Sequence, residues 1–202
     1  MNMITYFTIC FTVAVACGQD MPPVSQAEKK EIMALLMSEN DRAGRDQLVL
    51  RGSRVLPVLY EVATSPKSGA FERARVFRVL WRMNVPEKDK FVAVAAGSLA
   101  HDSGRFSVAA LALVAQSQDR RHARAVCDHL FRVFDIKNDF DWTGDIVKAL
   151  VAVGTEVELK RLERWLRDNP TDKYTGLAGE LFAKARINLV NAEKQLRAKL
   201  KK

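Results

Sequence analysis

The sequence predicts an all-α protein built from antiparallel helix pairs. No stretch of the chain alternates apolar and polar residues over the length of a β-strand. Apolar residues recur instead with the spacing of about 3.6 residues that one face of a helix requires. The segments between these periodic stretches are short, for example Asn84-Val85-Pro86 and Gly154-Thr155. Because such short turns reverse the chain, consecutive helices are expected to lie side by side in opposite directions.

Residues 1–17 are predicted to be a signal peptide. No charged side chain precedes Asp20, and residues 4–16 form an apolar run interrupted only by threonines. A bilayer span needs roughly 20 apolar residues, so this run suits the hydrophobic region of an export signal better than a membrane anchor. The segment departs from the usual pattern because it has no Lys or Arg near its start. The alternative is an apolar N-terminal helix that packs on the domain. We therefore expect an exported protein that is periplasmic, secreted or lipid-anchored.

The run Val13-Ala14-Val15-Ala16-Cys17 resembles the lipobox of bacterial lipoproteins. That resemblance implies a lipid attached to Cys17, which would tether the chain to a membrane surface. Ala14 stands where the family prefers a larger aliphatic residue, so plain cleavage after Ala16 or Gly18 is the alternative. Residues 18–25, which include two prolines, are predicted to be an extended linker.

Two short helices are expected to cover residues 26–50 and to cap the N-terminal end of the fold. Ser25 and Glu28 have the spacing of a capping box, and Ile32, Leu35 and Leu36 supply an apolar face. The helices predicted beyond Gly52 span residues 54–63, 70–83, 88–100, 104–117, 120–134, 143–153, 156–168 and 173–200, the last either broken or continuous.

Four helix pairs can be drawn over residues 51–85, 86–118, 119–154 and 155–189. Residues 52–59 resemble the opening helix of a HEAT repeat, and residues 72–80 and 105–113 resemble its second helix. Residues 147–162 resemble the junction between successive repeats. The resemblance covers residues 51–189 and implies a short right-handed α–α superhelix, a HEAT-like solenoid of about four helix pairs, followed by a basic helix end at 190–202. The alternative is a helical bundle with a closed core.

The predicted core consists of leucines that fill the layers between helices, together with alanines that allow close approach. The leucines are Leu56, Leu59, Leu80, Leu99, Leu111, Leu130, Leu159 and Leu162, and the alanines are Ala109, Ala110, Ala112 and Ala149. No repeat of this kind buries its apolar face alone, so the terminal helices have to act as caps.

No catalytic, cofactor-binding or metal-binding residue is predicted. The segment 139–146 matches the first half of a calcium-binding loop, but Leu150 stands where a bidentate Glu is needed, which favours a turn followed by a helix N-terminus. His122, Cys127 and His129 lack the spacing that brings ligands to one zinc ion. Cys127 is interpreted as a small buried apolar residue. The motifs of serine hydrolases, phosphate loops and zinc proteases are absent from the sequence, so no enzyme activity is expected.

Basic residues are the remaining candidates for a binding site. Lys and Arg number 32 against 24 acids, a net charge of +8. Arg75, Arg78 and Arg82 fall on one stripe of a predicted helix, and Arg105 stands at a similar place in the next second helix. Second helices line the concave side of a solenoid, so these four residues are expected to form a basic ridge that binds a partner. The alternative is a solvated helix face.

These features favour a non-enzymatic, exported scaffold that binds a protein or an anionic surface. The alternative is a nucleic-acid-binding protein similar to the HEAT-like alkylpurine DNA glycosylases, if residues 1–17 are not a signal. Export argues against that alternative, as does the lack of an aromatic platform within the arginine stripe. A third hypothesis is an enzyme subunit or lyase accessory of the kind that some short HEAT arrays resemble.

Overall fold

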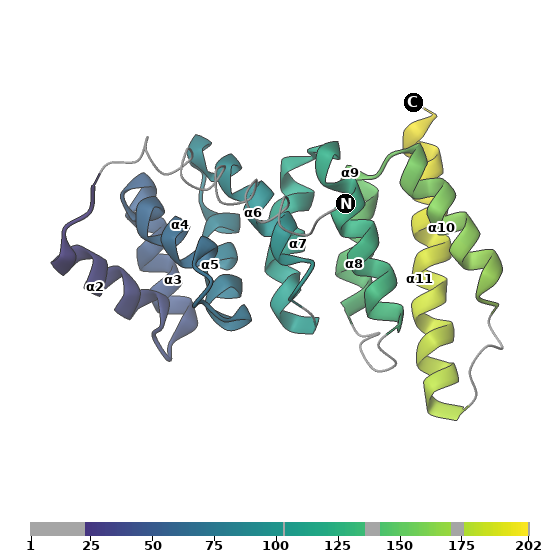
Figure 1. Ribbon diagram of the computed structural model, residues 1–202, viewed down its shortest axis with the longest axis horizontal. Helices are drawn as coiled ribbons and strands as arrows, with labels where there is room; N and C mark the ends of the chain where they lie inside the picture. The colour runs from purple at the N-terminus through teal and green to yellow at the C-terminus, as the bar shows by residue number, and fades with distance from the viewer. Residues whose placement is uncertain (1–22, 103, 136–141, 171–175, 202) are drawn as a thin grey trace, which may run out of the picture. The chain divides into compact units, whose positions relative to one another are not determined.

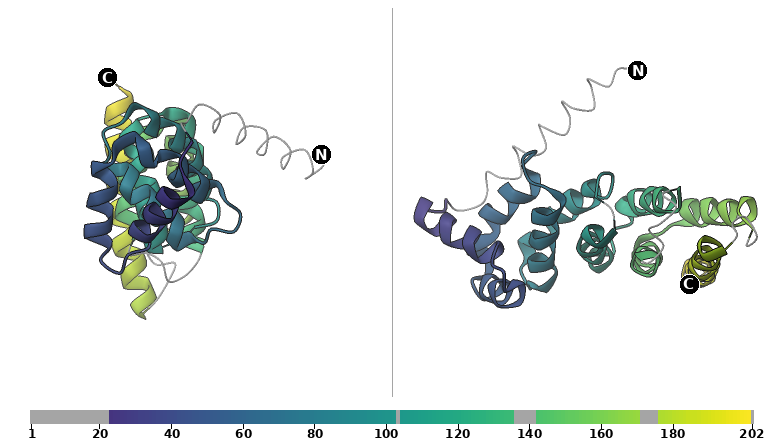
Figure 2. Two further views of the ribbon diagram at one scale, coloured as in Figure 1. Left: turned by 90° about the vertical axis from the view of Figure 1, so that its left-hand side faces the viewer. Right: turned by 90° about the horizontal axis from the view of Figure 1, so that it is seen from below.

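The computed structural model describes residues 23–102, 104–135, 142–170 and 176–201 (Figures 1 and 2). These residues form ten α-helices and four short 3₁₀ helices, and none of them lies in a β-strand. Helices pack in neighbouring pairs, which confirms the predicted all-α, solenoid-like class. The predicted signal peptide, including Cys17, and the calcium-like residues Asp139 and Asp141 lie outside the described residues. Within the described part of the chain, no helix is both long enough and apolar enough to cross a membrane.

The chain divides into two compact units, which are described separately. Unit 1 ends at Val94 and unit 2 begins at Ala95, within one helix. Unit 1 contains α2 (Gln26–Leu36), α3 (Asp41–Leu50), η1 (Gly52–Val55), α4 (Leu56–Thr64), α5 (Ala70–Arg82), η2 (Pro86–Asp89) and the start of α6 (Lys90–Ser98). Unit 2 contains the end of α6, η3 (Gly104–Phe106), α7 (Ser107–Ser117), η4 (Arg120–His122), α8 (Ala123–Asp135), α9 (Thr143–Val153), α10 (Glu156–Asp168) and α11 (Gly176–Leu200).

The first helices of unit 1 begin where local capping predicts. The Ser25 hydroxyl accepts a hydrogen bond from the Glu28 amide at 3.2 Å, and the Asn40 side chain accepts one from the Ala43 amide at 3.1 Å. Each bond satisfies an amide that has no partner within its own helix. The chain then crosses from α3 to α4 through Gly52, whose φ of +59° lies in the left-handed region.

The core of unit 1 is formed by α2, α3, α4 and α5. Its largest fully buried side chains are Phe77, Phe91, Ile32, Leu48, Leu56, Leu59, Leu80 and Met83. Gly44 is buried where α3 crosses α2, and a Cβ atom at this position would collide with the carbonyl oxygen of Leu35. A glycine at this position therefore allows the two helices to approach closely.

Helix α9 lies at the centre of unit 2 and packs against α7, α8 and α11. The predicted core residues Leu111, Leu130, Ala149 and Leu162 are fully buried. Helix α11 is one continuous helix of 25 residues. Its buried positions, spaced three and four residues apart, are Phe182, Ala185, Leu189, Ala192 and Leu196.

An aromatic cluster joins three helices of unit 2. The ring centroid of Trp165 on α10 lies 4.7 Å from that of Phe134 on α8 and 6.0 Å from that of Phe182 on α11. Tilted ring pairs at such distances are favourable beyond the apolar area that they bury. The cluster holds α10 and α11 to α8.

Four basic side chains donate hydrogen bonds to backbone carbonyls at the C-terminal end of another helix or in the turn directly after it. Arg75 donates to the carbonyls of Leu36 and Ser38 after α2, and Arg132 donates to those of Leu99 and Asp102 after α6. Lys199 donates to Val151 and Ala152 at the end of α9, and Arg186 donates to Leu166 and Asn169 at the end of α10. The last carbonyls of a helix lack partners within it and carry partial negative charge, so a cation placed there supplies both a hydrogen-bond donor and a positive charge.

Candidate functional site

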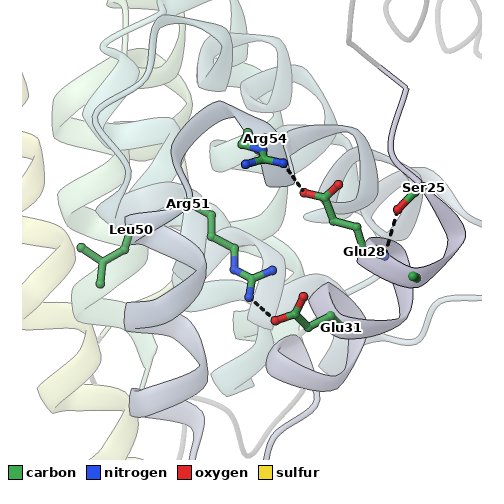
Figure 3. Close-up of a pocket in the computed structure, with 7 residues that line it drawn as sticks. Ser25, Glu28, Glu31, Leu50, Arg51 and Arg54 are labelled. Atoms are coloured by element: carbon green, nitrogen blue, oxygen red, sulfur yellow. Dashed lines mark hydrogen bonds and ion pairs between the residues drawn. The ribbon is translucent and has the colours of Figure 1, made fainter.

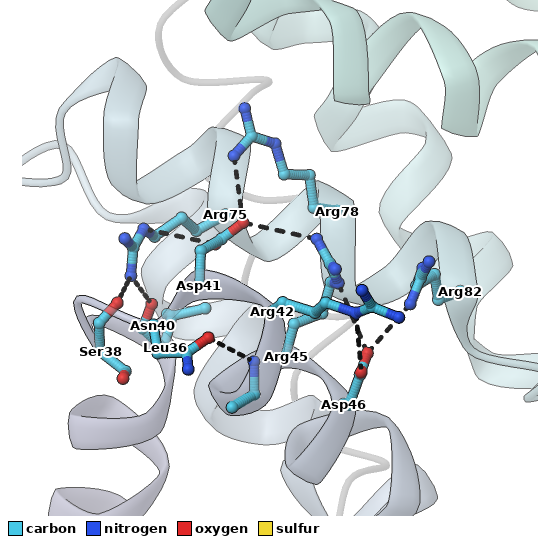
Figure 4. A network of polar contacts seen from close by, with 11 residues as sticks. Leu36, Ser38, Asn40, Asp41, Arg42, Arg45, Asp46, Arg75, Arg78 and Arg82 are labelled. Atoms are coloured by element: carbon cyan, nitrogen blue, oxygen red, sulfur yellow. Dashed lines mark hydrogen bonds and ion pairs between the residues drawn. The ribbon is translucent and has the colours of Figure 1, made fainter.

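The predicted arginine stripe faces α3 and meets two of its carboxylates. The arginine cluster, as we call it, consists of Arg42 and Arg45 on α3, Arg75, Arg78 and Arg82 on α5, and the carboxylates Asp41 and Asp46 on α3 (Figure 4). Helix α5 packs beside α3, which brings residues more than 30 positions apart in the chain together. Only the tertiary packing creates this site.

Each carboxylate of the arginine cluster is shared by three guanidinium groups. The Asp41 carboxylate lies 3.4 Å from Nη1 of Arg45, 3.5 Å from Nη1 of Arg78 and 3.7 Å from Nε of Arg75. The distance to Arg75 exceeds that of an ordinary hydrogen bond. Asp41 therefore neutralises charge without satisfying most of the donors around it.

Asp46 makes one close contact and two loose ones. Its carboxylate lies 3.0 Å from Nη1 of Arg82, 3.8 Å from Nε of Arg45 and 4.0 Å from Nε of Arg42. Five guanidinium groups therefore surround two carboxylates, and the arginine cluster has a net charge of +3. It is rich in hydrogen-bond donors and poor in acceptors.

Two donors of the arginine cluster are buried without an acceptor. Among the described residues, nothing accepts a hydrogen bond from Nε of Arg45 or Nε of Arg75. Both side chains line a small crevice between α3 and α5, together with Asp41, Leu36, Leu48 and Val79. An unpaired buried donor costs free energy, and the packing of α3 against α5 has to offset this cost.

Arg75 differs from the other members because it is buried within unit 1. Its side chain is 10% exposed, and its Nη1 donates to the carbonyls of Leu36 and Ser38 at 2.6 and 2.8 Å. Its guanidinium also lies 4.6 Å from the ring centroid of Phe71. Arg75 thus closes the end of α2 and does not stand on an open ridge, contrary to the expectation from the stripe.

The solvent-facing members are Arg78, Arg82 and Arg42, whose side chains are 39%, 45% and 85% exposed. Trp81, itself 48% exposed, follows Arg78 by three positions on α5 and precedes Arg82. Residues three apart on a helix are neighbours, so an aromatic ring borders the arginine cluster. A single exposed ring is not a platform interleaved with the stripe, so the expectation of no aromatic platform stays a prediction. The sequence carried a signal for Trp81 in its spacing from Arg78, but none for Arg42 and Arg45.

Arg105 belongs to unit 2 and is not a member of the arginine cluster. It is exposed in η3, and its guanidinium lies 5.0 Å from the ring centroid of its neighbour Phe106. Arg75 is buried and is not part of an exposed ridge, whereas a ridge that joins Arg78 and Arg82 to Arg105 stays a prediction.

An open groove of about 680 Å³ lies between the start of α2 and the junction of α3 with η1 (Figure 3). Two ion pairs line it: Glu28 lies 3.4 Å from Arg54, and Glu31 pairs with Arg51. The hydrogen bond from Arg51 holds the pKa of Glu31 below its usual value. Glu31 is thereby kept as an ion-pair partner and lacks the raised pKa that a general acid needs. Leu50, at the edge of the groove, is 86% exposed.

A buried histidine occupies the centre of a polar network in unit 2. Nε2 of His129 lies 3.1 Å from the Ser107 hydroxyl, and its Nδ1 lies 2.8 Å from Nη2 of Arg132. Burial and the nearby Arg132 charge lower the pKa of His129 to about 4, so the ring is neutral near pH 7. The serine and the histidine are both fully buried, which leaves no path for a substrate to this pair.

Polar partners lie on both sides of the His129 ring. The Ser107 hydroxyl lies 2.9 Å from the carbonyl of Gly104 and 3.1 Å from Nε2 of His129. On the other side of the ring, the Leu99 carbonyl lies 3.0 Å from Nδ1 and also accepts from Arg132. All of these partners belong to the packed interior of unit 2, so the network is a structural one.

The residues considered for zinc have separate partners. His122 lies 3.5 Å from Asp119, His129 bonds to Ser107, and the pKa of the buried Cys127 thiol is raised to about 12 by burial. In the described ranges of the chain, no three His, Cys, Asp or Glu side chains gather closely enough to hold a metal ion. No residue there is assigned to a cofactor.

Comparisons with models of protein families, with characterised proteins and with solved structures find no match for this chain.

Proposed function

We propose that this chain is a non-enzymatic binding protein, exported from the cytoplasm, that docks an anionic partner at the arginine cluster. The observation that carries the proposal is the excess of guanidinium groups, with five sharing two carboxylates. The exposed members Arg42, Arg78 and Arg82 can reach a ligand without any change in the fold. Complementary charge then raises both the rate and the specificity of association.

The all-α pairing of helices supports the HEAT-like interpretation of residues 51–189. Short helical arrays present extended surfaces for partners, which fits a binding role. The apolar, uncharged segment 1–17 supports export, and the run ending at Cys17 supports a lipid tether.

The binding site is tested by charge reversal with a matched control. In the full chain, Arg78→Glu combined with Arg82→Glu is compared with Arg164→Glu combined with Arg167→Glu, two exposed positions on α10 of unit 2. Both double variants change the net charge equally. Titration with poly-L-glutamate should show about a ten-fold or greater loss of affinity for the first variant only. An equal loss in both variants would mean that total charge, not the arginine cluster, determines binding.

Export is tested by fractionation and N-terminal sequencing of the mature protein. A chain that begins at or near Cys17 in the exported fraction is expected. Palmitate label that disappears in Cys17→Ala would support the lipid tether, and label that persists would contradict it. Recovery of intact Met1 in the cytoplasmic fraction would contradict export.

Binding to single-stranded nucleic acid is a second candidate function, and the exposed ring of Trp81 beside Arg78 favours it. Bases stack on exposed aromatic rings, and each contact of this kind stabilises a complex by about 1–3 kcal/mol. The test is the binding of a labelled single-stranded oligonucleotide to the full chain and to Trp81→Ala. This function requires the affinity to fall in the variant and to decrease steeply with salt.

A further inference from the structure

We propose that the exposed edge of α5 recognises a partner polypeptide that carries two carboxylates about 6 Å apart next to an apolar side chain. Arg78 and Arg82 bind the two carboxylates, and Trp81 receives the apolar side chain. This inference rests on the proposed function, because it names the partner of the same arginine cluster.

The spacing of Arg78 and Arg82 sets the distance between the two acidic groups. The residues are four positions apart on α5, which corresponds to a rise of about 6 Å along the helix axis. In an extended peptide, side chains two positions apart lie on one face and are separated by about 6.6 Å. A segment with acidic residues at positions i and i+2 therefore matches the two guanidinium groups.

Both guanidinium groups can exchange their present partners for a ligand. Arg78 lies 3.5 Å from Asp41, and Arg82 lies 3.0 Å from Asp46, with all four side chains at least one third exposed. Ion pairs of this exposure contribute little to stability, so an incoming carboxylate can replace or share them. A guanidinium binds a carboxylate best through two parallel hydrogen bonds, which the loose contact of Arg78 leaves unformed.

The acids within the arginine cluster favour a polypeptide over a nucleic acid as the partner. A nucleic-acid strand carries a negative charge on every nucleotide, so a strand that crosses the cluster would bring some of its phosphates against Asp41 or Asp46. Arg75 is buried and donates its hydrogen bonds to carbonyls at the end of α2, so it is not available to a ligand and interrupts the basic stripe. Two isolated carboxylates meet only the aspartate that is already paired with each arginine, and each can replace or share that one contact.

Trp81 supplies the apolar part of the surface. Its side chain is about half exposed, unlike the neighbouring Phe77 and Leu80, which are fully buried. A large exposed ring beside charged groups is typical of the anchor positions in protein interfaces. The apolar side chain of the partner is expected two positions from its second acidic residue, on the same face of the extended segment.

The test uses the full chain and labelled peptides at 150 mM salt, a condition typical for such measurements. The first peptide contains Glu-Ser-Glu-Ser-Leu, the second has Gln in place of both Glu residues, and the third places the same two Glu residues six positions apart. Fluorescence anisotropy should show the first peptide binding about ten-fold more tightly than either of the others. Arg78→Gln with Arg82→Gln should abolish this preference, and Trp81→Ala should weaken binding several-fold.

Asp46→Asn is a variant that is expected to bind the first peptide more tightly than the parent does. It removes the carboxylate that competes for Arg82, so the first peptide should bind about three-fold more tightly. A cluster with a purely structural role would show no gain. Thermal melts of each variant confirm that the fold is retained.

Three outcomes would overturn this inference. The first is equal binding of the three peptides, and the second is preference for the first peptide that survives in the Arg78→Gln, Arg82→Gln variant. The third is tighter binding of a single-stranded oligonucleotide than of any peptide at the same site. The two proposals can fail separately. If the three peptides bind equally, but the Arg78→Glu, Arg82→Glu variant loses affinity for poly-L-glutamate, this inference is wrong and the proposed function is still supported.

Discussion

Arg75 in unit 1 and Arg132 in unit 2 make the same kind of contact in different surroundings. Each donates to two carbonyl groups just beyond the end of another helix. Arg75 is surrounded by other arginines and by Asp41, whereas Arg132 lies against the neutral ring of His129. The comparison shows that some basic residues hold the fold together, so positive charge in the sequence does not by itself mark a binding surface.

The largest effect is expected from a charge in the core of unit 2. Leu111 on α7 is fully buried, and Leu111→Glu should destabilise unit 2 by more than about 5 kcal/mol because an unpaired carboxylate would replace apolar contacts. Circular dichroism melts should show loss of its cooperative transition. Val157→Glu, at a position that is 63% exposed, is the control and should melt like the parent. A parent-like melt for Leu111→Glu would contradict the placement of this core.

Removing the two capping arginines compares the units directly. Arg75→Met should lower the free energy of unfolding by about 4 kcal/mol, and Arg132→Met by about 3 kcal/mol, because each leaves two carbonyls without a charged donor. Urea denaturation measures both values. Arg78→Met, on the same helix as Arg75 but facing solvent, should change stability by less than about 0.5 kcal/mol. Equal effects of Arg75→Met and Arg78→Met would show that Arg75 is not a cap.

The buried His129 beside Arg132 predicts that the free energy of unfolding of unit 2 depends on pH. The pKa of His129 falls from 6.5 to about 4 on folding, so the unfolded chain binds the proton more readily. The contribution of His129 to the free energy of unfolding is therefore fully present above about pH 6.5. It is lost as the pH falls toward 4, by a total of about 3 kcal/mol.

Urea midpoints measured between pH 7 and pH 4 test this dependence. His129→Gln should flatten the curve, whereas His101→Gln, at an exposed position, should leave it unchanged. If the urea midpoint of His129→Gln changed with pH as it does in the parent, His129 would not be the source of the pH dependence.

The smallest effects concern two helical glycines. Gly44→Ala should destabilise unit 1 by about 2 kcal/mol, because its Cβ atom would collide with the Leu35 carbonyl and push α3 away from α2. Gly97→Ala on α6 is the control, since its Cβ atom meets no described atom within 4 Å. It should stabilise the protein by up to about 1 kcal/mol. Thermal melts distinguish the two, and a stabilising Gly44→Ala would refute the close approach of α2 and α3.

Much of the helical architecture follows from local sequence signals. The start of α2 at Ser25 and Glu28 was predictable because a capping interaction involves residues only three apart. The burial of Leu59, Leu80 and Leu111 was predictable because helical periodicity places them on apolar faces. Element boundaries were less accurate, since 3₁₀ turns precede α4, α6, α7 and α8.

The arginine cluster was only partly predictable. The spacing of Arg75, Arg78 and Arg82 identified a shared face of α5, but not that the face meets Asp41 and Asp46 on α3. Trp81 follows Arg78 by three positions on α5, so its place beside the stripe could have been predicted from that spacing.

The sequence by itself therefore determined that the chain forms helices, where most of them lie and which faces are apolar, because these properties depend on residues within one or two turns of each other. Only the tertiary structure decided which cations became buried caps, which carboxylates they met and which arginines remained exposed. Those outcomes depend on contacts between residues 17 to 48 positions apart, whose geometry is set by how the helices pack.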